Sequence, residues 1–181
     1  MRTISLDIET YSSVDLAKSG VYRYCESPDF EVLFFACSID GGTVEVFDLA
    51  NGEELPSFIV HALLNENIEK RAWCASFERI CLSRHILKDC NSYLSPVGWR
   101  CTMIQAAYLG LPFSLEQAGQ VLGIEKAKLA DGRRLINKFS KPQKHTDQIT
   151  LGMQDQDWEL FKAYNRRDVE AEMEIHSKLS A

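Results

Sequence analysis

The sequence predicts an α/β fold in which a mixed β-sheet is flanked by α-helices and the C-terminal half is largely helical. Strand-like patterns come first and begin with a hairpin, whereas helical periodicity dominates later in the chain. Of the 181 residues, 45% are hydrophobic and 25% are charged, a balance that suits one globular domain with a sizeable core. Because the chain carries no internal repeat and no sign of a second domain, we expect residues 1–181 to form a single domain.

Three strands are expected in the first fifty residues. Apolar and polar side chains alternate along Thr3–Glu9, which is typical of a half-buried strand. The longest apolar stretch, Val32–Cys37, lies within Glu31–Ile39 and predicts a buried strand. Asp40-Gly41-Gly42 is a strong hairpin signal, so Thr43–Leu49 should return as the third strand.

A helix, a strand and a second helix should follow. Leu55–Leu64 is amphipathic, and Pro56 suits the first turn of a helix. Lys70–Ala75 predicts a fourth strand. Phe77–Leu87 has apolar residues at helical spacing, which predicts a helix with one apolar face.

Four helices are expected in the C-terminal half, at Thr102–Leu109, from Ser114 to Gly123, at Ala130–Phe139 and at Asp157–Leu179. Thr102 suits an N-cap, and the segment that begins at Ser114 matches a capping box. The polar residues 141–154 are expected to form an exposed loop. Lys141 could reach a phosphate from this loop, although a solvated linker is the simpler interpretation.

Composition narrows the class of protein. No apolar run reaches the ~18–20 residues that span a bilayer, and the N-terminus has no secretory signal, so we expect a cytoplasmic protein without a membrane partner. The net charge of −6 argues against an extended surface that grips long nucleic acid, because such surfaces are usually basic. It still permits an enzyme that holds a few terminal nucleotides through metal ions.

The six cysteines form no Cys-x-x-Cys pair. Several lie in apolar segments, so reduced and mostly buried thiols are expected. A disulfide framework or a zinc site is the alternative.

Acidic residues gather at three places that a folded chain could bring together. Asp7 and Glu9 lie two residues apart on the first strand, so they share a face. Tyr164 and Asp168 lie four apart on the last helix and also share a face, while Glu78 follows the fourth strand. Each of these patterns alone is usually structural: a solvated strand end, a tyrosine at the edge of the core, or an acid that favours a helix N-terminus.

Together these acids suggest a metal centre. Two carboxylates side by side repel each other, so a positive group should sit between them. Oxygen ligands from several carboxylates suit Mg²⁺ or Mn²⁺. Two such ions, about 3.5–4 Å apart, can clamp the attacking and leaving oxygens of a phosphoryl displacement.

In this order, the motifs resemble a known family. The chain is similar to the proofreading 3′→5′ exonuclease domain of family A DNA polymerases, particularly those of phages and prophages, in the tyrosine-type (DEDDy) subclass of ribonuclease-H-like exonucleases. The resemblance covers nearly the whole chain. It is carried by Asp7-Ile8-Glu9-Thr10, Phe77-Glu78 and Tyr164-Asn165-Arg166-Arg167-Asp168, and it extends through Gly20-Val21-Tyr22-Arg23-Tyr24, Arg100-Cys101-Thr102-Met103 and Ser114-Leu115-Glu116.

Details of the motifs refine this resemblance. The histidine-type subclass would carry histidine at position 163, where this chain has Ala163. The second motif departs from the family pattern, because Glu78 stands where the family usually has Asp. Four residues earlier, Cys74 replaces the usual Asn, and a thiol poorly replaces an amide that both donates and accepts.

The resemblance implies a two-metal hydrolysis that releases nucleoside 5′-monophosphates. Asp7, Glu9 and Asp168 would hold one cation, and Asp7 with Glu78 the other. Tyr164 would orient the attacking water, since an ordinary phenol remains protonated near neutrality.

The resemblance also implies partners. The Thr10 backbone and the Phe77 side chain would touch the terminal nucleotide of a single-stranded DNA 3′ end, although core packing explains Phe77 equally well. A polymerase domain or subunit is a further possible partner. Two alternatives stay open: an exoribonuclease with the same chemistry, and a catalytically idle domain that binds strands or a partner protein.

Overall fold

The computed structural model describes residues 1–88, 92–124, 131–142 and 156–180, and in them five strands form one mixed sheet in the order β3-β2-β1-β4-β5. β1 pairs antiparallel with β2, which pairs antiparallel with β3, while the β1–β4 and β4–β5 pairs are parallel. This sheet confirms the predicted mixed architecture. The strands are β1 (Thr3–Tyr11), β2 (Glu31–Ile39), β3 (Glu45–Asp48), β4 (Glu69–Ala72) and β5 (Trp99–Cys101).

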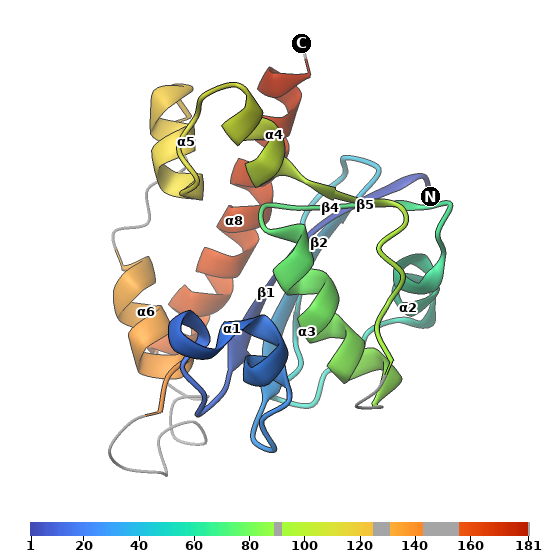
Figure 1. Cartoon of the computed structure of the whole chain (residues 1–181), viewed down its shortest axis with the longest axis vertical. Coiled ribbons are helices and arrows are strands. Elements are labelled where there is room, and N and C mark those ends of the chain that lie inside the picture. The colour runs from blue at the N-terminus through green and yellow to red at the C-terminus, as the bar shows by residue number, and fades with distance from the viewer. Residues whose placement is uncertain (89–91, 125–130, 143–155, 181) are drawn as a thin grey trace.

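Helices cover both faces of this sheet (Figure 1). α1, α2 and α3 lie on one face, while α6 and α8 lie on the other. α4 and α5 pack against α8. The helices are α1 (Leu16–Cys25), α2 (Ser57–Leu64), α3 (Ala75–Leu87), α4 (Thr102–Tyr108), α5 (Leu115–Val121), α6 (Gly132–Phe139) and α8 (Gln156–Leu179).

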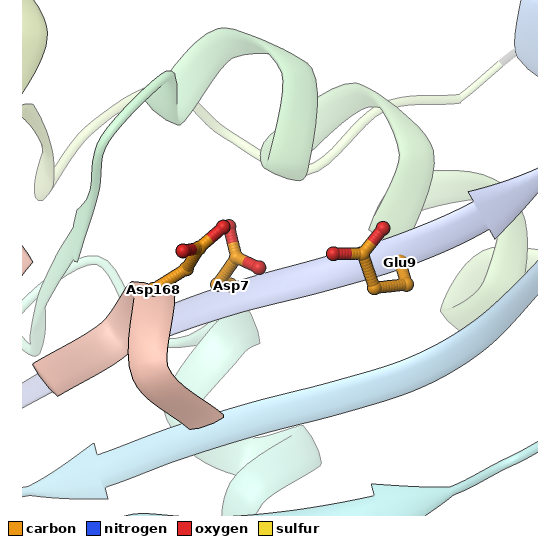
Figure 2. A group of neighbouring side chains, drawn as sticks. All are labelled: Asp7, Glu9 and Asp168. Carbon is orange, nitrogen blue, oxygen red and sulfur yellow. The ribbon is translucent and has the colours of Figure 1, made fainter. Parts of the chain in front are cut away.

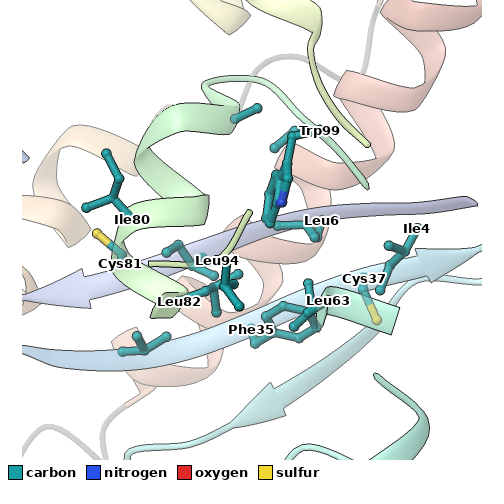
Figure 3. Packing of buried hydrophobic residues seen from close by; sticks show 14 of the residues in the cluster. Ile4, Leu6, Phe35, Cys37, Leu63, Ile80, Cys81, Leu82, Leu94 and Trp99 are labelled. Atoms are coloured by element: carbon teal, nitrogen blue, oxygen red, sulfur yellow. The ribbon is translucent and has the colours of Figure 1, made fainter. Parts of the chain in front are cut away.

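The apolar residues of β1 point to the α3 face. Ile4, Leu6 and Ile8 belong to a buried cluster that also contains Phe35 of β2 and Leu82 of α3 (Figure 3). Because neighbouring residues of a strand face opposite ways, the odd-numbered residues of β1 turn towards α8. The alternation that buries Ile4, Leu6 and Ile8 in the core therefore also directs Asp7 and Glu9 towards α8.

The predicted hairpin turn is confirmed. Asp40 and Gly41 both have positive φ, 49° and 78°, which matches the twist that a short turn between antiparallel strands requires. The Asp40 carboxylate accepts hydrogen bonds from the backbone N–H groups of Arg2 and Thr3, at 2.7 and 2.8 Å. The turn is thereby tied to the start of β1.

A buried lysine joins α2 to the sheet. Lys70 of β4 is only 1% exposed, and its Nζ donates to the carbonyl oxygen of Asn65 at 2.6 Å. Asn65 is the C-cap of α2, where helix carbonyls lack partners and the helix dipole favours a cation. Burial lowers the pKa of Lys70, whereas the charge of Glu66 raises it.

Two elements were not predicted. α1 begins at an N-cap, Asp15, whose carboxylate accepts from the N–H groups of Ala17 and Lys18, and it bends at Gly20, where φ is 76°. β5 is only three residues long, too short for an alternating pattern to show. The cap at Asp15 is a local signal that the sequence reasoning missed, whereas β5 depends on its pairing with β4.

Several predicted boundaries were wrong. Thr102 is the first residue of α4 rather than its cap, and its hydroxyl donates to Glu172. Pro56 is the N-cap of α2 and precedes the helix. The fourth strand ends at Ala72, because α3 already begins at Ala75.

Other sequence expectations agree with the structure where it describes them. Ser114 caps α5, since its hydroxyl accepts from the N–H of Gln117. The five cysteines in the described ranges are free thiols, as expected. Within those ranges, no helix is long and apolar enough to cross a membrane. Ala130, Cys90 and all but the first two residues of the predicted loop 141–154 lie outside the described part.

Candidate active site

Three carboxylates converge between β1 and α8. Asp7 and Glu9 project from the same side of β1, and Asp168 reaches them from α8 (Figure 2). One carboxylate oxygen from each lies within 4.8 Å of the others, a separation that one cation could bridge. The prediction that Asp7 and Glu9 share a face is therefore confirmed, and the structure adds Asp168 to them.

The pairing of α8 with β1 places these acids. Asp168 raises the pKa of Asp7 through its charge, and one turn earlier Glu9 raises the pKa of Tyr164 in the same way. One turn later, the proximity of Ser5 lowers the pKa of Glu172. Strand numbers thus fall as helix numbers rise, so α8 runs antiparallel to β1. Each helical turn on this face of α8 meets one inward position of β1.

The acids are held in a strongly anionic setting. Burial raises the pKa of Asp7 well above its ordinary value, and the charges of Asp168 and Glu78 raise it further. Burial and then the charges of Asp7 and Asp168 raise the pKa of Glu9 in the same way. Burial also raises the pKa of Asp168 to about 7, against a hydrogen bond from Tyr164 that lowers it. The cluster must therefore hold either protons or cations.

Tyr164 stands at the edge of this cluster as a hydrogen-bond donor. Burial raises its pKa above the ordinary value, and the neighbouring charges of Asp168 and Glu9 add to this effect. The phenol is consequently protonated at neutral pH. Its ring packs against the start of α6: a methyl group at Gly132 would come within 2.9 Å of Cζ and 3.2 Å of Cδ2, and closer still to Cε2.

Glu78 approaches from the α3 side, outside the group of three acids. β4 pairs with β1 only as far as Ser5, and the chain then turns into α3, whose first turn carries Glu78. Glu78 is 3% exposed, and its Oε2 has no hydrogen-bond partner in the described residues. Burial raises its pKa, and the charges of Glu172 and Glu9 raise it further.

The two residues expected to touch a nucleotide line one pocket beside the acids. This pocket, about 650 Å³ in volume, is walled by Glu9, Thr10, Phe77, the start of α1, the end of α6 and Lys141. Thr10 is 5% exposed, and its hydroxyl shares a 2.8 Å hydrogen bond with the hydroxyl of Tyr24. The hydroxyl of Thr10 is thus already engaged in the wall of the pocket, which Glu9 also lines.

Sequence reasoning missed two polar residues of α8 at this site. Asn165 donates from Nδ2 to Oδ2 of Asp7 at 2.7 Å and is fully buried. Glu172 is 1% exposed and bonded to Thr102. Their spacing from Asp168, three residues before and four after, was the available signal, because both spacings place a residue on the same helix face.

Comparison with known proteins supports the fold and points to nucleases and polymerases. A DNA polymerase from Bacillus phage SP02 is 42% identical over 186 residues, an alignment that covers 99% of this chain and 28% of the polymerase. The chain thus spans little more than a quarter of that relative. No family model matches the sequence.

Two solved structures have a similar fold. One, described as the apo form of the nuclease, has a TM-score of 0.52 and 18% identity, and the match covers 99% of this chain and 72% of that one. Brucella melitensis NrnC has a TM-score of 0.51 and 14% identity, with 98% and 72% coverage. The predicted α/β fold, a ribonuclease-H-like mixed sheet flanked by helices, is confirmed.

Proposed function

We propose that this chain is a metal-dependent 3′→5′ exonuclease domain that shortens DNA from its 3′ end and releases nucleoside 5′-monophosphates. The observation that carries the proposal is the convergence of Asp7, Glu9 and Asp168, with one oxygen of each within 4.8 Å of the others. Three acids at this distance, of which Glu9 is buried and Asp7 and Asp168 are half-buried, repel one another unless a positive charge joins them. An arrangement so unfavourable without a cation points to function rather than to stability.

The donor set fits two hard divalent cations, Mg²⁺ or Mn²⁺. All the candidate ligands are carboxylate oxygens, the type that these ions prefer. Asp7, Glu9 and Asp168 would hold one ion. Asp7 would hold the other together with Glu78, whose buried Oε2 lacks a partner in the described residues. Bound there, the cations would activate the attacking water and stabilise charge on the leaving 3′ oxygen.

The remaining residues would position the reactants. The Tyr164 hydroxyl, protonated and next to Asp168, can donate a hydrogen bond that orients the attacking water. The pocket beside Glu9 can receive the terminal nucleotide, with Phe77 offering an apolar wall for its base and Thr10 its backbone. Because every base has an apolar face, such a wall accepts all four bases, as an exonuclease without sequence preference requires.

The similarity to the phage SP02 polymerase favours DNA over RNA as the substrate. It also favours a proofreading setting, in which residues 1–181 form a single exonuclease domain that works beside a polymerase domain or subunit. A single-stranded 3′ end is then the natural substrate, since a mispaired terminus is frayed.

The test is a digestion of single-stranded DNA labelled at its 5′ end, with Mg²⁺, with Mn²⁺ and with EDTA. Asp7→Asn tests the acid cluster, and Glu116→Gln, which removes an exposed carboxylate from α5, is the matched control. We expect a ladder that shortens from the 3′ end with either metal, is absent in EDTA and in Asp7→Asn, and persists in Glu116→Gln.

An RNA oligomer of the same sequence serves as the competing substrate. Faster shortening of RNA would replace the proposal with an exoribonuclease. No shortening of either strand by folded protein would identify a binding domain without catalysis.

A further inference from the structure

Asn165 occupies an unusual place for an amide. It lies on α8 between Tyr164 and Asp168 in the sequence, is 0% exposed, and faces β1 rather than solvent. Its Nδ2 donates to Oδ2 of Asp7 at 2.7 Å. This contact joins two residues that are 158 positions apart in the chain.

The polarity of this hydrogen bond leaves one oxygen of Asp7 available. An amide nitrogen only donates and an ionised carboxylate only accepts, so this hydrogen bond engages Oδ2 of Asp7. The other carboxylate oxygen, Oδ1, can still bind a cation. The outermost torsion of an aspartate is broad, and an unrestrained carboxylate samples many orientations. Holding Oδ2 therefore restricts where the second oxygen can point.

The carbonyl oxygen of the same amide makes no compensating hydrogen bond in the described residues. Oδ1 of Asn165 is buried and has no hydrogen-bond partner in the described residues, which is unfavourable for folding. A leucine has nearly the same size and shape and would carry no unsatisfied oxygen. In the described residues, what an amide at this position contributes is its hydrogen bond to Asp7.

We propose that Asn165 is a positioning residue of the metal centre, which fixes the rotamer of Asp7 so that one carboxylate oxygen is presented to the cation. This inference rests on the proposed function, because it deepens the role of Asp7 in that site. Groups that orient a metal ligand typically change metal affinity or activity by about 10- to 100-fold when removed. Asn165 should therefore act on metal binding before it acts on DNA binding.

The experiment compares Mn²⁺ binding by calorimetry, without DNA, in the wild type, in Asn165→Leu and in Asn165→Ala. Leucine keeps the size of the side chain, whereas alanine cannot clash. Trp158→Phe is the matched control, because Trp158 also donates a buried hydrogen bond from α8 to a strand carboxylate, Asp48, at 2.8 Å. Circular dichroism and thermal melting in EDTA establish that each variant is folded.

We expect both Asn165 variants to bind Mn²⁺ about 10- to 100-fold more weakly, with the Mn²⁺ concentration for half-maximal digestion rising in parallel. The KM for DNA at saturating Mn²⁺ should stay within about twofold of the wild type, and Trp158→Phe should bind Mn²⁺ normally.

Three results would overturn the inference. These are folded Asn165 variants with normal Mn²⁺ affinity, variants that lose Mn²⁺ only because they are unfolded in EDTA, and a wild type that binds no Mn²⁺. A wild type that binds Mn²⁺ but digests no nucleic acid would refute the proposed function alone, and the calorimetry would still decide the role of Asn165.

Discussion

A single methyl group added at Gly132 should displace the ring of Tyr164. The new Cβ would lie 2.9 Å from Cζ of the ring, whereas carbon atoms in good contact are about 3.5–4.0 Å apart. The ring must retreat by roughly 0.6 Å at that atom, and by more at Cε2, which lies closer. Gly132 is the first residue of α6 and does not have the positive φ that would forbid alanine, so the effect is purely steric.

Such a shift moves the Tyr164 hydroxyl out of the position from which it should orient the attacking water. Since a misplacement of about 1 Å in an active site can slow a reaction about 10²-fold, we expect Gly132→Ala to lower kcat roughly 10- to 100-fold. Overpacking should also destabilise the fold by about 1–3 kcal/mol. Single-turnover digestion of labelled DNA at saturating Mn²⁺ measures the first effect, and urea unfolding measures the second.

A double-mutant cycle isolates the cause. Tyr164→Phe removes the hydroxyl but keeps the ring, so Gly132→Ala should have little further effect on kcat in that background. If Gly132→Ala slows digestion equally with and without the hydroxyl, it does not act through Tyr164 and the reasoning fails. Full activity in Gly132→Ala alone would refute it as directly.

Three further predictions concern charge. Asp7→Asn should reduce metal-dependent digestion by at least about 10³-fold yet raise the melting temperature in EDTA, because it removes a carboxylate charge that Asp168 and Glu78 repel; a lower melting temperature would contradict this. Burial raises the pKa of Asp168 from 3.8 to about 7, so the folded state binds an extra proton between these pH values. Stability in EDTA should therefore fall as the pH rises from about 4 to about 7, and the contribution of Asp168 should be lost above that range. Added Mn²⁺ should reverse that trend, and melting curves at several pH values measure both. Lys70→Met should cost about 1–3 kcal/mol in urea unfolding, by leaving the Asn65 carbonyl without its donor, and should not change kcat.

Much of the site was predictable because it follows from local periodicity. The period of two along β1 put Asp7 and Glu9 on one face, and the period of 3.6 along α8 put Tyr164 and Asp168 on another. The order of strands and helices then predicted the class of fold. These patterns need no knowledge of which helix meets which strand.

What escaped prediction depends on long-range contacts. Asn165 and Glu172 could have faced solvent, and only the docking of α8 on β1 buries them beside Asp7 and Ser5. Glu78 stands apart from the three acids because the direction of its side chain depends on where β4 leaves β1. Thr102 suited a cap by its chemistry, but its partner is Glu172, seventy residues away in the sequence.

The antiparallel pairing of α8 with β1 constrains chain length as well as side-chain chemistry. Four residues of helix rise about 6.0 Å and two residues of strand advance about 6.6 Å. The three pairs Tyr164–Glu9, Asp168–Asp7 and Glu172–Ser5 therefore stay nearly in step along α8 and β1. One residue inserted between Tyr164 and Asp168 would rotate the acid about 100° around the helix axis. One inserted between Asp7 and Glu9 would send one acid into the apolar core. Substitutions at positions of α8 and β1 that face away from the site leave this register intact. Insertions and deletions in either element would instead separate the site residues in space, even though each of those residues is unchanged.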